Sequence, residues 1–76
     1  MPALFTAHRY GNEFEVTSMR LLAYLCQLPV AITERRLNEW RAEGHPHDNI
    51  DMEVFIEFAR SRTPDADILQ GPLLPW

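Results

Sequence analysis

Three histidines and one cysteine are the residues of this sequence that could bind a metal ion or attack a substrate. His45 and His47 lie two residues apart, with Asp48 beside them, whereas Cys26 is distant along the chain. A zinc site usually has ligand pairs at both ends of a loop, and here the second pair is missing. Cys26 falls on the apolar stripe of a predicted helix, which is typical of a small buried thiol. The sequence therefore predicts neither a metal site nor a catalytic cysteine.

Other catalytic arrangements have equally little support. Glu53 and Glu57 could in principle act as a general acid and base, but both fall on the outer face of an amphipathic helix, where solvated charge is expected. The three glycines lie far apart, so no glycine-rich loop can cradle a phosphate. We expect a binding protein that is not an enzyme and that uses no cofactor.

A predicted helix over residues 34–43 has the side chains best suited to recognition. Leu37 and Trp40 mark its buried side, so arginine and asparagine side chains point outward or lie on the flanks. Arginine and asparagine read the edges of guanine and adenine, and flanking arginines suit phosphates. The alternative is an ordinary surface helix with an ion pair between Arg35 and Glu39. The candidate DNA-binding residues are Arg35, Arg36, Asn38 and Arg41.

Charge is unevenly distributed along the chain. Residues 1–42 have five arginines against four glutamates, and residues 43–76 have two arginines against seven acidic residues, which gives +1 and −5 and together the net charge of −4. The asymmetry indicates either two functional faces or chance variation in a small protein. Every positive charge is an arginine, which can make forked contacts to phosphate or carboxylate. The candidate acidic, protein-binding face comprises Asp48, Asp51, Glu53 and Glu57.

The elements that position these residues are predicted to be mainly helical. Alternating apolar residues predict a short N-terminal β-hairpin, with strands at residues 3–8 and 14–16 and a turn at residues 10–13. Thr17 or Ser18 caps a first helix that runs to about Gln27. Because Pro29 cannot lie inside a helix, residues 28–31 are expected to form a turn, and Thr33 to cap the second helix. Asp51 caps a third helix that ends near residue 62.

A chain of 76 residues allows one domain with one core. We expect a compact three-helix domain over residues 1–64 and an extended apolar tail over residues 65–76. The tail is too apolar for an idle terminus, so it is expected to pack on this chain or on a second copy, although many termini are loose. No apolar run approaches membrane-spanning length, the N-terminus lacks the pattern of a signal peptide, and a single cysteine fits the cytoplasm.

The stretch Arg36-Leu37-x-x-Trp40-x-x-x-Gly44-x-Pro46 resembles the winged-helix domains of lambda-type small terminase subunits, phage excisionases and MerR-type regulators. The wider layout, from Leu4 to Arg60, looks like small pyocin-activator regulators. The resemblance implies a winged-helix-like fold whose second helix enters the major groove of DNA. Two features depart from these families: the turn containing Pro29 is longer, and the residues between Pro46 and Asp51 are too few for a two-stranded wing.

Two functional hypotheses follow. The first is a small phage-type or mobile-element-type helix-turn-helix regulator that binds duplex DNA, with a homodimer through the third helix and the tail as a further expectation. The alternative is an acidic inhibitor, similar in style to anti-CRISPR and other anti-defence proteins, that docks on a host nucleic-acid-binding complex. Its carboxylates would then imitate a phosphate backbone. The fold signal favours the first hypothesis, and the acidic balance favours the second.

Overall fold

The chain begins with a tight β-hairpin. In the computed structural model, which describes residues 3–69, β1 (Phe5–Arg9) pairs antiparallel with β2 (Asn12–Val16). Tyr10 and Gly11 form the turn with φ angles of 54° and 81°. Positive φ at both central positions matches the twist of the flanking strands. The predicted hairpin is confirmed.

Two helices follow and are joined by a short turn. Helix α1 (Met19–Cys26) begins after Ser18, whose side chain accepts a hydrogen bond from the Leu21 amide at 3.1 Å. Gln27 ends the helix in the left-handed conformation. Helix α2 (Val30–Ala42) then begins directly after Pro29. Only residues 27–29 separate the two helices.

The predicted start of α2 is wrong. Pro29 occupies the N-cap, where the absence of its N–H costs no helical hydrogen bond. Thr33 lies inside the helix and is buried, and its hydroxyl donates to the Pro29 carbonyl at 2.9 Å. The turn between the two helices is therefore shorter than expected.

The segment after α2 returns to the hairpin. β3 (Ile50–Asp51) pairs parallel with β1, giving a sheet of order β2-β1-β3, and this third strand was not among the two predicted from the sequence. Helix α3 (Met52–Ser61) follows at once, with Asp51 as its N-cap as predicted. Pairing of β3 with β1 thus anchors the start of α3 beside the hairpin.

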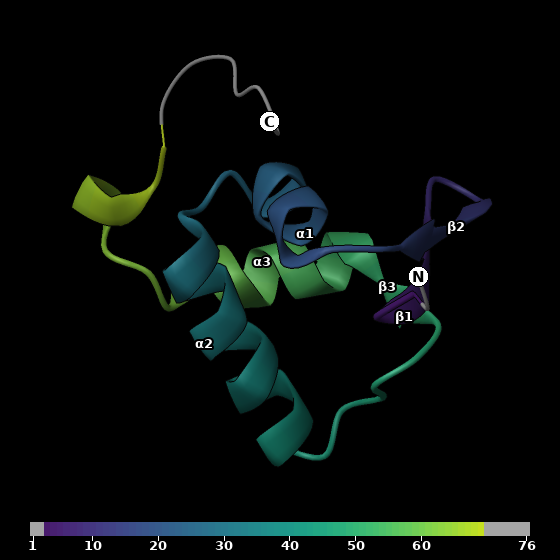
Figure 1. Cartoon of the computed structure of the whole chain (residues 1–76). Helices are drawn as coiled ribbons and strands as arrows, with labels where there is room; N and C mark the ends of the chain where they lie inside the picture. Colours follow the sequence, from purple (N-terminus) through teal and green to yellow (C-terminus); the bar gives the residue numbers. More distant parts are fainter. Residues whose placement is uncertain (1–2, 70–76) are drawn as a thin grey trace.

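The three helices pack together beside the small sheet (Figure 1), so the chain is mainly α with a short β-hairpin. After the short helix η1 (Asp65–Asp67), Ile68 packs against the core and the Leu69 amide donates to the Gln27 carbonyl at 3.0 Å. The tail therefore packs on its own chain as far as residue 69, and its remaining part, residues 70–76, lies outside the described residues. No helix within residues 3–69 has the length and apolar character to span a membrane. The buried core residues are Phe5, Ala7, Val16, Leu22, Cys26, Leu28, Leu37, Trp40, Ile50, Met52, Phe55 and Ala59.

Candidate nucleic-acid interface

Helix α2 has one buried side and one side open to solvent. Leu37 and Trp40 are buried, as predicted from the sequence. Arg35, Asn38 and Arg41 are all exposed. Because they are spaced three residues apart, they form one row along the outer face of the helix. We call these three residues the α2 row.

The side chains of the α2 row make no side-chain hydrogen bond or ion pair with the part of the chain that the structure describes. The ion pair considered between Arg35 and Glu39 does not form, because Glu39 pairs with Arg36 at 2.9 Å and with Arg62 at 3.6 Å. Among residues 3–69, no side-chain hydrogen bond or ion pair involves Arg35, Asn38 or Arg41. Two guanidinium groups and one amide are therefore available to an external partner.

Arg36, by contrast, is a structural residue, and its assignment to the DNA-binding set is wrong. It is only 8% exposed. Its Nε donates to the Thr63 hydroxyl at 3.1 Å, and its terminal nitrogens donate to Glu39 and to the Arg62 carbonyl, both at 2.9 Å. All three guanidinium nitrogens are thereby used: two hold α2 against the segment that follows α3, and the third pairs with Glu39 within α2.

An aromatic cluster fixes the chain beyond the C-terminal end of α2. The Trp40 indole N–H donates to the Pro46 carbonyl at 2.8 Å, and the His45 ring stacks on Trp40 with centroids 4.0 Å apart. The Arg62 guanidinium covers the Phe58 ring at 4.1 Å and also pairs with Glu43, which lowers the pKa of that carboxyl. The orientation of α2 is therefore set at both ends, by Pro29 and by this cluster. Of these contacting residues, only Trp40 and Pro46 were singled out from the sequence.

Two of the four predicted acidic-face residues serve local structure. Asp48 accepts hydrogen bonds from the Thr6 hydroxyl, from the Thr6 amide at 2.6 Å and from the Asn49 amide at 2.9 Å, and these bonds lower its pKa. Asp51 accepts from the Glu53 amide at 3.0 Å as the cap of α3. These two carboxylates are held by the loop and the helix start rather than presented as a free row.

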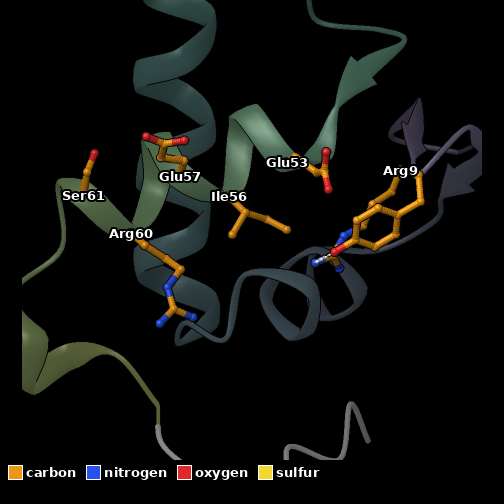
Figure 2. Close-up of a pocket in the computed structure, with 7 residues that line it drawn as sticks. Arg9, Glu53, Ile56, Glu57, Arg60 and Ser61 are labelled. Atoms are coloured by element: carbon orange, nitrogen blue, oxygen red, sulfur yellow. Dashed lines mark hydrogen bonds between the residues drawn. The ribbon is translucent and has the colours of Figure 1, made fainter.

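The other two acidic residues, Glu53 and Glu57, line a groove of about 530 Å³ between the hairpin and α3. Arg9 from β1 and Arg60 from α3 line the same groove, and Figure 2 shows them on either side of Ile56. This groove has no signature in the sequence, because Arg9 and Arg60 are 51 positions apart and meet only through the fold.

Cys26 has no environment for nucleophilic chemistry. The side chain is fully buried in the core, and this burial raises the pKa of the thiol to about 12. A buried neutral thiol is a poor nucleophile, because the thiolate is the reactive form. Within residues 3–69, no group of three histidine, cysteine or acidic side chains is placed to hold a metal ion.

No protein-family model matches the chain, and comparisons with curated proteins and with solved structures found no match either. Function is therefore inferred from the residues themselves. Two surfaces bring predicted site residues together, exposed and without ion pairs among residues 3–69: the α2 row, and the pair Glu53 and Glu57 in the groove.

Proposed function

We propose that the protein is a helix-turn-helix DNA-binding protein whose recognition helix is α2. The proposal is supported by the order of α1, a three-residue turn and α2. In a helix-turn-helix, the second helix lies in the major groove and its side chains contact base edges. The first helix packs across it and holds it at a fixed angle, which is the part we assign to α1.

The observation that carries the proposal is the unpaired α2 row. Arg35 and Arg41 can reach guanine edges or phosphates, and Asn38 can bond adenine. Glu39 would neutralise Arg35 on an ordinary surface helix, but Arg36 and Arg62 bind Glu39 instead. By pairing with Glu39, buried Arg36 thus keeps this carboxylate away from the α2 row.

The net charge of −4 does not fall on this face. Glu34 is exposed beside the row, and Glu43 is exposed just beyond it, where it pairs with Arg62. Asp48 and Asp51 are bound locally, and Glu53 and Glu57 lie in the groove on α3. Binding to duplex DNA requires positive potential only where phosphates approach. The arrangement is winged-helix-like in this proposal, with the N-terminal hairpin in the role of the wing and β3 as its third strand.

The proposal is tested by fluorescence anisotropy with labelled duplex DNA at about 50 mM and 200 mM salt. Binding is expected at low salt and should weaken steeply as salt rises. Arg35→Ala and Arg41→Ala should each cost about 1–3 kcal/mol of binding free energy. Arg20→Ala is the matched control, because it removes the same charge from an exposed position on a different helix, the first turn of α1. Absence of binding at low salt, or equal losses in all three variants, would contradict the proposal.

The acidic-inhibitor alternative is favoured by one observation, the exposure of Glu53 and Glu57 without ion-pair partners among the described residues. It requires capture of a basic, nucleic-acid-binding complex and no affinity for DNA. Glu53→Gln together with Glu57→Gln should abolish such capture. Capture that survives both substitutions excludes charge mimicry by this pair.

A further inference from the structure

The groove between the hairpin and α3 contains charges of both signs. Glu53 and Glu57 come from the outer face of α3, and Arg60 lies one turn further along the same helix. Arg9 reaches the groove from β1. In Figure 2, Ile56 lies between the two arginines and points into the space that they border. An apolar centre with charged margins has the composition of a small protein interface.

These four charged side chains do not neutralise one another. Within residues 3–69, no ion pair joins either arginine to either glutamate. The arginines instead donate to neutral oxygens: Arg9 to the Tyr10 hydroxyl at 3.3 Å, and Arg60 to the Gln27 side-chain carbonyl at 2.8 Å. Two positive and two negative groups therefore border one groove with their charges uncompensated.

Tyr10 stands at the rim of this groove in an unfavourable conformation. Its φ of 54° is in the left-handed region, where asparagine or glycine is the usual residue of a tight hairpin turn. Its side chain is 73% exposed, so core packing does not compensate for this conformation. An exposed aromatic side chain held in this way is suited to act as an anchor in a binding interface.

We propose that this groove is the interface of a symmetric homodimer. A polyanion would be repelled by Glu53 and Glu57, and a strongly basic partner by Arg9 and Arg60. A surface with both signs fits a partner with both signs, and in a two-fold dimer each surface meets its own copy. An antiparallel pair of α3 helices brings Glu53 toward Arg60 of the partner subunit on both sides of the axis, around Ile56.

This inference goes beyond DNA binding and does not rest on it, since a dimer can form without DNA and a monomer can bind DNA. A two-fold dimer presents two copies of α2, which corresponds to two half-sites on a duplex. The oligomeric state is measured on the free protein. Its outcome is therefore separate from the outcome of the DNA-binding experiment.

Sedimentation equilibrium of the full chain over a range of concentrations tests the dimer. We expect a species of twice the 8.9 kDa chain mass that dissociates on dilution. Glu53→Arg and Arg60→Glu should each weaken association by about tenfold or more, because each places like charges together. The double variant restores opposite charges across the axis and should recover association. Glu15→Arg, an exposed reversal on β2, is the matched control and should have no effect.

Tyr10→Asn gives a second readout that a loss of folding cannot imitate. Asparagine before Gly11 favours the hairpin turn, so thermal stability of the monomer should be kept or raised while association weakens. A monomer at every concentration overturns the proposal. A dimer that is insensitive to Glu53→Arg, Arg60→Glu and Tyr10→Asn also overturns it, because its interface must then lie elsewhere. Failure of the double variant to recover association overturns it as well.

Discussion

Arg35 and Arg36 are neighbours in the chain and have opposite surroundings. Arg35 is exposed and makes no ion pair within residues 3–69, whereas Arg36 uses its whole guanidinium group inside the fold. Arg36→Ala should lower the free energy of unfolding by about 2–3 kcal/mol, because bonds from a charged donor to Thr63 and the Arg62 carbonyl are lost. Arg35→Ala should change it by less than about 0.5 kcal/mol. Urea unfolding followed by circular dichroism measures both, and equal losses would contradict these assignments.

The sequence could place Arg35 and Asn38 on the outer face, but not Arg36 on the inner one. With Leu37 and Trp40 as the apolar guides, Arg36 falls on a flank that amphipathic periodicity leaves undecided. Its burial depends on Thr63 and the Arg62 carbonyl, which approach from a segment more than 25 residues away. Such a contact is a property of the tertiary structure and has no local signature.

Cys26 should be chemically inert in the folded protein. Burial raises the pKa of its thiol to about 12, so both access and ionisation oppose reaction. Labelling with a thiol-reactive disulfide at pH 8 should be slow in buffer and fast in concentrated urea. Rapid labelling of the native protein would show that this part of the core opens readily.

Asp48 should make the free energy of unfolding depend on pH in the acidic range. Hydrogen bonds from Thr6, and to a smaller extent from Asn49, lower the pKa of Asp48 in the folded protein. Its contribution to the free energy of unfolding is therefore present above the ordinary pKa of a carboxyl and is lost as the pH falls through the folded pKa. The urea concentration at the unfolding midpoint should therefore decrease as the pH is lowered below about 4. The decrease should be smaller in Asp48→Asn. Asp65→Asn is the control, because its side chain makes no hydrogen bond or ion pair within residues 3–69. An identical acid dependence in Asp48→Asn and wild type would contradict this role.

At the scale of elements, the start of α1 depends on which of two neighbouring residues is its N-cap, and Ser18 rather than Thr17 has that role. The Ser18 hydroxyl accepts from the Leu21 amide, while Thr17 is exposed before the helix. Ser18→Ala should cost about 1 kcal/mol of stability, the usual value of an N-cap. Thr17→Ala should cost less than about 0.5 kcal/mol. Thermal unfolding compares the two variants. A larger loss of stability in Thr17→Ala than in Ser18→Ala would contradict the assignment of Ser18 as the N-cap.

Elements with local signals were predictable, and elements that depend on distant partners were not. The Tyr10-Gly11 turn and the Asp51 cap each depend on residues next to one another in the sequence, and both predictions are confirmed. The start of α2 was misplaced because Thr33 resembles an N-cap, although Pro29 allows the helix to begin four residues earlier. The short strand β3 exists only through parallel pairing with β1, which is more than 40 residues away.

At the scale of the molecule, the fold separates two surfaces. One is the α2 row, with Arg35, Asn38 and Arg41 unpaired; the other is the mixed-charge groove on α3. Summed charge suggested an acidic second half of the chain, but the fold brings Arg9 into that region and commits Asp48 to the loop. The α2 row was predictable from helical spacing alone, whereas the groove needed the tertiary structure.

The central claim is that α2 is the surface that meets DNA. It is tested most directly by amide chemical-shift mapping of the labelled protein during titration with duplex DNA at low salt. We expect the largest shift changes at Arg35, Asn38 and Arg41, with little change at Glu53 and Glu57, and reversal of the changes at high salt. No shift changes at low salt, or changes confined to α3, would contradict it.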